Sequence, residues 1–244
     1  MMVIGLRVVL LWWNTMMVDG KLLIGEKKVK VKLVSHTQTV DGLSLTEQVA
    51  YAARVSNPSN QGNNDTAEKL VKYLINNKHW SPLEMVSVSL EIETTRDIAR
   101  QILRHRSFSF QEFSQRYADP TKELDFEVKE ARLQDPTNRQ NSIKTDDYML
   151  DAGWDNVQRN VIRAAQSAYE WAIDNGIAKE QARAVLPEGL TVSILYMTGT
   201  LRSWLHYIEI RSGNGTQKEH MDVARACADI ITEVFPLTKE FVQE

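Results

Sequence analysis

Residues 104–116 concentrate polar and charged side chains in one short segment, which reads Arg104-His105-Arg106-Ser107-Phe108-Ser109-Phe110-Gln111-Glu112-Phe113-Ser114-Gln115-Arg116. The segment follows residues 98–103, an apolar stretch with helical periodicity, so its first positive charges stand where a helix ends. Such charges are favourable at a helix C-terminus even without a ligand. The hydroxyl, amide, carboxylate and guanidinium groups that follow are better explained by a ligand-binding loop. Because arginine presents a planar fork of donors to phosphates and imide carbonyls, we expect the ligand to be a nucleotide.

The composition limits the class of protein. A chain of 244 residues, 43% of them hydrophobic, suffices for one sizeable domain or two small ones. Its formal net charge of -3 excludes a globally basic nucleic-acid binder, so phosphate recognition must come from a local cluster of arginines. The single cysteine, Cys227, excludes an internal disulfide and a multi-cysteine metal site and is typical of a reducing compartment. We therefore expect no metal centre and a cytoplasmic location, or the host cytoplasm if the source is viral.

Hydrophobic periodicity predicts an α+β fold in which an antiparallel or mixed sheet packs against helices. The expected strands lie near residues 29, 86 and 190. The main expected helices cover residues 44–53, 65–76, 94–103, 154–175, 201–211 and 216–234, and a shorter one ends at Pro187. Capping-box patterns that begin at Ser44 and Thr216 predict the starts of the first and last of these helices.

Two helices carry predictions about burial. The apolar stripe of the helix over residues 154–175 is expected to face the core, and it consists of Val157, Val161, Ala164, Ala168 and Trp171. Cys227 lies in a similar stripe of the last helix, so we expect an inert, buried thiol with a raised pKa.

The helix over residues 94–103 presents two polar faces. Gln101 and Arg104 are three residues apart on one face, which we interpret as functional, whereas Arg96 and Arg100 share another and are expected to be solvated.

Residues 1–27 have no clear pattern, and we treat them as an N-terminal extension of unclear role ahead of a single domain, residues 28–244. The apolar residues 8–13 resemble a signal-peptide core, but no small-residue cleavage site follows, and the run is too short to span a bilayer. An extra strand, or an extension ahead of a natural start near Met16 or Met17, explains them equally well. Residues 117–152 are rich in charges and turn residues, which predicts a surface loop, with a lid or an oligomer arm as the alternative.

Several motifs, in matching order, resemble the flavin-dependent thymidylate synthase family. Arg104-His105-Arg106, followed after seven residues by Ser114, is similar to that family's signature, and Arg116 stands where the family also has an arginine. Four further segments are similar: Ala52-Ala53-Arg54-Val55-Ser56, His79-Trp80-Ser81-Pro82-Leu83-Glu84, Ala182-Arg183-Ala184-Val185-Leu186-Pro187, and Arg202-Ser203-Trp204 onward to Arg211. Together they extend the resemblance over residues 29–235.

This resemblance implies the reductive methylation of dUMP to dTMP, with FAD as cofactor, NADPH as reductant and the folate 5,10-methylenetetrahydrofolate as carbon donor. It also implies a homotetramer whose flavin sites are shared between subunits, which fits the lack of a GxGxxG fingerprint ahead of a helix. Neither nucleic acid nor a membrane is then an expected partner. A buried Cys227 agrees with this chemistry, because no other cysteine is present to attack the uracil ring.

The family's functional positions transfer to this chain one by one. Those that contact FAD in the family are Ser56, Ser81, Glu84, Arg104, His105, Arg106, Ser107, Glu112, Thr200, Arg202 and His206. Those that contact dUMP are Gln101, Arg104, Glu112, Ser114, Gln115, Arg116, Arg183 and Arg211. Arg211 corresponds to the arginine that activates the pyrimidine ring, so we expect it to be catalytic. The chain departs from the family pattern at Gln111, Gln115 and Thr200, where asparagine, glycine and asparagine are common.

Two other functions fit parts of the sequence. A module for single-stranded nucleic acid would use the arginines for phosphates and aromatic rings for stacking, namely Arg104, Arg106, Arg116, Phe108, Phe110 and Phe113. The negative net charge opposes this function, and a yellow, flavin-containing protein would exclude it. A catalytically inactive family member kept for assembly would carry the same motifs, and a dUMP methylation assay separates it from the enzyme.

Overall fold

A four-stranded sheet runs through the computed structural model, which describes residues 17–18, 21–22 and 29–243. Its strands follow the order β3 (Lys30–His36), β4 (Ser87–Thr95), β8 (Val192–Thr200) and β5 (Ser109–Glu112). All neighbours are antiparallel, and β4 pairs with β8 along its full length, from Ser87 opposite Thr200 to Thr95 opposite Val192. The predicted α+β class is confirmed, and the sheet is antiparallel rather than mixed.

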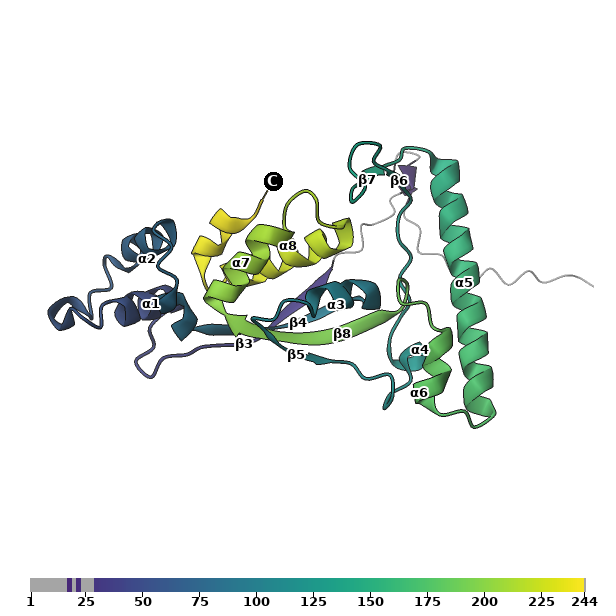
Figure 1. The fold of residues 1–244 in the computed structure, drawn as a ribbon, viewed down its shortest axis with the longest axis horizontal. Helices are drawn as coiled ribbons and strands as arrows, with labels where there is room; N and C mark the ends of the chain where they lie inside the picture. The colour runs from purple at the N-terminus through teal and green to yellow at the C-terminus, as the bar shows by residue number, and fades with distance from the viewer. Residues whose placement is uncertain (1–16, 19–20, 23–28, 244) are drawn as a thin grey trace, which may run out of the picture.

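Three helices cover one face of this sheet: α3 (Arg96–Ile102), α7 (Leu201–Arg211) and α8 (Lys218–Thr232) (Figure 1). Alternation along β4 turns Val88, Leu90 and Ile92 toward these helices, where all three are buried. From α7, Trp204 is fully buried and its indole N–H donates to the Val88 carbonyl at 3.0 Å. The hydrophobic core therefore lies between the sheet and this helix layer.

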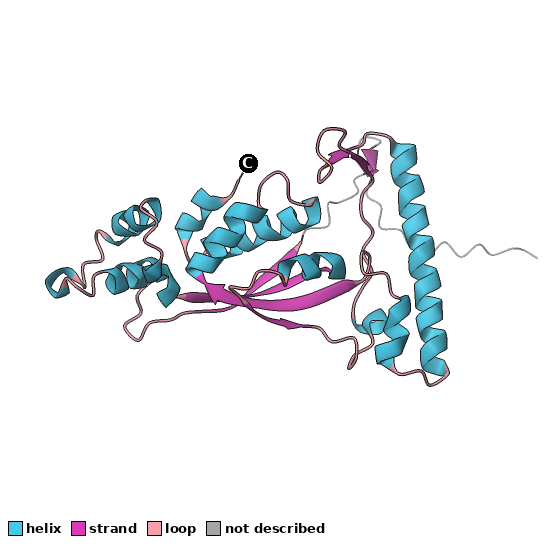
Figure 2. Cartoon of the chain, viewed as in Figure 1, coloured by secondary structure: helices cyan, strands magenta, loops and turns pink. Residues whose placement is uncertain are grey.

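Further helices lie at both ends of the sheet (Figure 2). One end carries α1 (Leu45–Ala53), η1 (Pro58–Asn60), α2 (Ala67–Asn76) and the short 3-10 helix η2 (Ser81–Met85), and η4 (Pro236–Phe241) follows α8. The other end carries α4 (Pro120–Glu123), β6 (Arg132–Gln134), β7 (Ser142–Lys144), α5 (Tyr148–Asp174), α6 (Lys179–Ala182) and η3 (Arg183–Val185). A separate pair, β1 (Met17–Val18) and β2 (Lys21–Leu22), precedes them. The prediction about residues 1–27 otherwise falls outside the described residues.

The two predicted capping boxes have different outcomes. At α1 the box forms, because the Ser44 hydroxyl accepts from the Glu47 N–H while the Glu47 carboxylate accepts from the Ser44 N–H at 2.7 Å. The prediction for Thr216 was wrong: α8 begins at Lys218 with Gln217 as its N-cap and no side-chain cap bond. The Glu219 carboxylate, which would close that box, instead accepts from the Gln217 amide and pairs with Arg132.

The long helix α5 differs from its prediction in start and in orientation. It begins at Tyr148, six residues earlier than expected, because the Asp147 carboxylate caps the N–H of Leu150. The predicted core stripe was also wrong: Val157, Val161 and Trp171 are exposed. The helix packs on its own chain through another face, formed by Gln158, Ala165, Tyr169 and Ala172. Among the described residues, neither α5 nor any other helix is apolar enough over a sufficient length to cross a bilayer.

Candidate active site

The segment 104–116 is fixed to the sheet by an aromatic side chain. Phe108 is buried and packs edge-on against Trp204, with ring centroids 4.8 Å apart. Its ring lies so close to β8 that a Cβ added at Gly199 would stand 2.4 Å from a ring carbon. The prediction of a loop needs correction at the centre, where Ser109–Glu112 forms the edge strand β5 because it follows β8 in register. Polar side chains therefore flank a rigid strand on both sides.

Two residues expected at the site touch each other on the helix side of the sheet. The Nε–H of Arg211 donates to Nε2 of His105 at 3.1 Å, and the His105 ring stands edge-on against Tyr207 at 4.9 Å. Burial, and after it the positive charge of Arg211, lowers the pKa of His105 to about 4. The imidazole is therefore neutral near pH 7 and accepts from the guanidinium.

A buried histidine that the sequence did not single out orients the amide of Gln101. His220 Nδ1 lies 3.3 Å from Gln101 Oε1, and its Nε2 lies 3.1 Å from the hydroxyl of Tyr207. Because an amide oxygen only accepts, Nδ1 carries the proton and Nε2 accepts from the tyrosine. Burial, followed by the charge of Arg211, lowers the pKa of His220 to about 3, so this neutral tautomer persists. The other end of the same amide donates to Gln217 Oε1 at 2.8 Å, which holds Gln101 in one orientation.

Several of the expected flavin contacts lie near the Thr200 end of β8, whereas Glu112 lies toward the other end, bonded to Ser193. Glu84, on η2, forms an ion pair with Arg202 in the first turn of α7. Thr200 caps α7 by accepting from the Ser203 N–H, and the Ser203 hydroxyl in turn donates to the Ser107 carbonyl at 3.3 Å. Other members are exposed, namely Ser56, Ser81, Arg104, Arg106 and His206. Within the part of the chain that the structure describes, the guanidinium groups of Arg104 and Arg106 have no ion-pair partner and are free for an anionic ligand.

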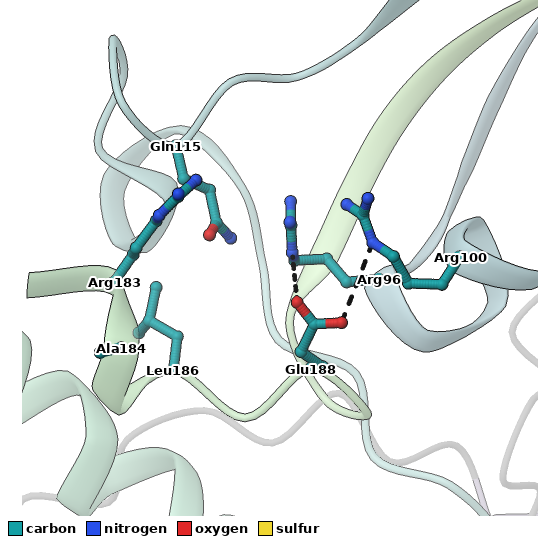
Figure 3. Close-up of a pocket in the computed structure, with 7 residues that line it drawn as sticks. All are labelled: Arg96, Arg100, Gln115, Arg183, Ala184, Leu186 and Glu188. Atoms are coloured by element: carbon teal, nitrogen blue, oxygen red, sulfur yellow. Dashed lines mark hydrogen bonds and ion pairs between the residues drawn. The ribbon is translucent and has the colours of Figure 1, made fainter. Parts of the chain in front are cut away.

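A pocket of about 520 Å³ lies at the opposite end of β8. Its lining consists of Arg96, Arg100, Gln115, Arg183, Ala184, Leu186 and Glu188 (Figure 3). Gln115 and Arg183 are members of the expected dUMP set, and they face Arg96 and Arg100 across the pocket. The residues that line the pocket come from α3, from the end of segment 104–116 and from the α6–β8 connection.

We expected Arg96 and Arg100 to be solvated; the prediction was wrong for Arg96, which is buried, whereas Arg100 is exposed, and both are engaged with carboxylates. Arg96 is buried, and Arg100 donates to both oxygens of Glu112, at 2.8 and 2.7 Å. Arg96 lies 3.4 Å from Glu112 and 3.3 Å from Glu188. The Ser193 hydroxyl also donates to Glu112 at 2.9 Å. Two arginines one helical turn apart repel each other unless an acid lies nearby, and this spacing was the available signal in the sequence.

Gln115 has the most informative position in the pocket. Its side chain is buried, and its Nε2 has no hydrogen-bond partner among the described residues. An unpaired buried N–H costs about 1–3 kcal/mol, so this amide is available to donate to an acceptor that enters the pocket. Ser114 is half-buried beside it, and Arg116 is exposed and pairs with Glu180 of α6 at 3.5 Å.

The nucleotide pocket and the flavin residues around Thr200 are far apart within one chain. Thr200 and Ser193 mark the two ends, and they stand seven positions apart along the strand, roughly 23 Å. Cys227, by contrast, is fully buried in α8, and burial raises the pKa of its thiol well above the ordinary range. The prediction of an inert cysteine is therefore confirmed.

Comparison with known proteins identifies the family of this chain. Residues 32–237 match the family described as thymidylate synthase complementing protein. A probable flavin-dependent thymidylate synthase of Paramecium bursaria Chlorella virus 1 is 48% identical over 210 residues, which cover 85% of this chain and 96% of the viral protein. The chain belongs to the flavin-dependent thymidylate synthase family.

Other members of the family and a solved structure agree with this assignment. The flavin-dependent thymidylate synthase of Synechocystis sp. is 46% identical over 211 residues, covering 84% of this chain and 95% of that protein. The UMP/dUMP methylase PolB from Streptomyces cacaoi, solved with bound 5-Br dUMP, aligns with a TM-score of 0.70 at 26% identity, covering 87% of this chain and 93% of that one. The family predicted from the motifs is therefore confirmed.

Proposed function

We propose that this chain methylates dUMP to dTMP, taking the carbon from 5,10-methylenetetrahydrofolate and electrons from NADPH through FAD. The observation that carries the proposal is the unpaired, buried amide N–H of Gln115 in a pocket that also holds three arginines. A nucleotide phosphate and a pyrimidine carbonyl are the kinds of acceptors that such donors fit. Membership of the family supports the same substrate.

For dUMP, we assign the pocket and the residues that border it. Arg183, Gln115 and Arg116 supply donors for the phosphate and sugar, and Ser114 adds a hydroxyl beside them. Glu112, held by Arg96, Arg100 and Ser193, is a fixed acceptor at the rim. The remaining members, Gln101, Arg104 and Arg211, approach from the helix side of the sheet.

For FAD, the exposed donors near Thr200 fit a dinucleotide. Arg104 and Arg106 have no competing ion pair among the described residues, and Arg202 is held by Glu84 with its charge near the surface. Their charges suit the diphosphate, and the set is completed by Ser56, Ser81, His105, Ser107, Glu112, Thr200 and His206. When bound, FAD supplies the reducing electrons that convert the transferred one-carbon group into a methyl group.

Arg211 is the residue we assign to activation of the pyrimidine. Its Nε–H is used by His105, and its terminal nitrogens make no hydrogen bond within the described part of the chain. A guanidinium fixed in this way donates to a uracil carbonyl and stabilises the ring after N3 loses its proton. The buried Cys227 thiol takes no part, because it neither reaches the surface nor ionises near neutral pH.

A homotetramer with shared sites accounts for the separation along β8. One chain holds its flavin group and its nucleotide pocket at opposite ends of the strand, whereas the reaction needs both ligands in contact. Pairing of subunits places the Thr200 end of one copy beside the pocket of another. We accordingly assign residues 28–244 to one catalytic domain and leave residues 1–27 as an extension.

Titration of dUMP into the FAD-loaded protein tests the pocket. Gln115→Leu removes the unpaired amide with little change in volume, and we expect dUMP affinity to fall about tenfold, the effect of one lost hydrogen bond. The control is Gln111→Leu, an exposed glutamine of β5, which leaves affinity unchanged. If Gln115→Leu binds dUMP as the parent chain does, while both variants keep their melting temperature and flavin, the assigned pocket is wrong.

A further inference from the structure

The outward face of α5 carries an apolar stripe with a strict period. Its members, which we call the α5 seam, are separated alternately by four and three residues, and they are Leu150, Trp154, Val157, Val161, Ala164, Ala168 and Trp171. This spacing is the heptad pattern of two helices that pack along each other. A helix that only needed to pack on its own chain would not require it.

The described part of the chain leaves the α5 seam uncovered. Val157 is 50% exposed and Trp171 is 63% exposed, while Leu150, Trp154 and Val161 are each 44% exposed. Contacts of α5 with its own chain run instead through α6, η3 and residues near Lys129, whose backbone N–H donates to Gln158 at 2.9 Å. Figure 1 shows α5 at the edge of the molecule, with α6 and the sheet on one side only.

The exposed apolar area of the seam is that of the largest patch on a typical monomer, and such patches often bind a partner. The five large side chains of the seam leave on the order of 500 Å² of apolar area exposed on each copy. This area is larger than that of a single exposed apolar side chain and is typical of a surface that binds a partner. Two such surfaces together bury about 1,000 Å², which is the minimum expected of a specific protein interface.

We propose that the α5 seam binds the same seam of a second copy of this chain, antiparallel and about a twofold axis. Leu150 and Trp154 lie near the N-terminal end of the seam, Ala164 and Ala168 follow its centre, and Trp171 lies at its C-terminal end. An antiparallel pair centred between Val157 and Val161 sets Trp154 of each copy against Ala164 of the other, and Leu150 against Ala168. Trp154 and Leu150 then each meet an alanine, whereas a parallel pair sets Trp154 against Trp154. Trp171 falls opposite the N-terminal end of the partner's α5.

Charge permits this self-association. The positions that flank the seam on its solvent side are Gly153, Asn160 and Ser167, all uncharged, so two copies bring no like charges together there. The other flank is already packed on the chain's own residues. The inference rests on the proposed homotetramer, for which it names one interface; α5 also packs against η3, which carries Arg183 of the nucleotide pocket.

Molar mass in solution tests the interface, with two variants that each add one negative charge to an exposed position of α5. Val161→Glu lies at the centre of the seam, and we expect it to reduce the mass of the assembly to half or less while the helical circular dichroism is kept. Asn156→Glu lies outside the seam and keeps the parent mass. An unchanged mass for Val161→Glu overturns the proposal. A parent chain that fails to make dTMP, with a mass that still depends on Val161, refutes the function and leaves the interface standing.

Cysteine cross-linking tests the orientation. Oxidation of the double variant Trp154→Cys/Ala164→Cys gives a disulfide-linked dimer, whereas either single variant stays unlinked. Cross-linking of Trp154→Cys alone means a parallel pair and overturns the arrangement. Deletion of residues 1–16 leaves the mass unchanged; a rise in mass on deletion means that this segment, rather than a second copy, covers the seam.

Discussion

Arg211 and His105 lie against each other, with the Nε–H of the arginine donating to Nε2 of the histidine across 3.1 Å. The contact joins the end of α7 to the centre of the Arg-His-Arg motif, 106 residues away in the chain. It fixes the direction of the guanidinium while its terminal nitrogens remain available. Because burial and Arg211 keep the imidazole neutral, the pair carries one positive charge rather than two.

Replacing Arg211 should separate substrate activation from folding. Arg211→Lys keeps the charge but loses the planar fork and the bond to His105, and we expect turnover to fall about a hundredfold or more, as when an electrostatic stabiliser is deleted. Flavin content should change little. Single-turnover dUMP methylation and the melting temperature, measured on the same preparation, check this.

Arg225→Lys is the matched control. Arg225 donates to the Ser212 carbonyl at 2.9 Å and to the Gln243 carbonyl at 3.1 Å, so it holds the end of α7 without facing a ligand. We expect lower stability and normal specific activity. If Arg211→Lys behaves like this control, Arg211 is a structural arginine and has no catalytic role.

The buried histidines predict a dependence of stability on pH. His220 has a folded pKa of about 3, against an ordinary value near 6.5, so between these values the unfolded chain binds the extra proton. Stability is therefore fully present above about pH 6.5 and is lost as pH falls toward the folded value. The contribution of His220 between pH 7 and pH 5 is about 2 kcal/mol.

Urea unfolding at the two pH values measures that contribution. His220→Asn should lose less stability between pH 7 and pH 5 than the parent chain does. His79→Asn removes an exposed histidine and should retain the parent's full loss. Equal losses in the parent chain and His220→Asn would show that His220 is not held neutral by the fold.

Local patterns in the sequence predicted the elements that hold the site better than they predicted its contacts. The bounds of α7, Leu201–Arg211, follow from a change in period at Thr200 that needs no distant partner. The burial of Arg96 was missed, because one of its two partners, Glu188, lies 92 residues away. Only the antiparallel pairing of β4 with β8 brings the two segments together.

The burial of α5 was mispredicted for a related reason. A heptad stripe shows that Val157 and Val161 need an apolar neighbour, but it does not say which chain supplies that neighbour. The face that packs within the chain contains Gln158 and small alanines, which hydropathy does not mark as core. His220 was missed because a lone histidine in an apolar helix gives no sign of its bond to Gln101.

Gly199→Ala should displace the Arg-His-Arg segment. The added Cβ would stand 2.4 Å from the Phe108 ring, and Trp204 packs against the same ring, so the ring cannot easily move away. We therefore expect a loss of about 1–3 kcal/mol in stability. Flavin affinity should fall as well, because Arg104–Ser107 precedes the displaced ring. Gly62→Ala is the control, since nothing lies within 4 Å of its new Cβ. Normal flavin binding by folded Gly199→Ala would contradict the anchoring role of Phe108.

Cys227→Ala should leave dTMP formation nearly intact. The thiol is fully buried, and burial raises its pKa, so it cannot act as a nucleophile. Loss of sulfur packing should lower stability by about 1 kcal/mol. Urea unfolding and specific activity check the two effects, and an inactive variant that remains folded and yellow would contradict a cysteine-independent reaction.

The central claim is that this chain makes dTMP from dUMP with the flavin rather than a cysteine as its reactive centre. The most direct measurement is an anaerobic assay of dUMP methylation by the purified chain, supplied with FAD, NADPH and 5,10-methylenetetrahydrofolate. We predict dTMP that forms in proportion to bound FAD and disappears when FAD or dUMP is omitted. A folded, FAD-loaded protein that binds dUMP yet yields no dTMP under these conditions would contradict the account.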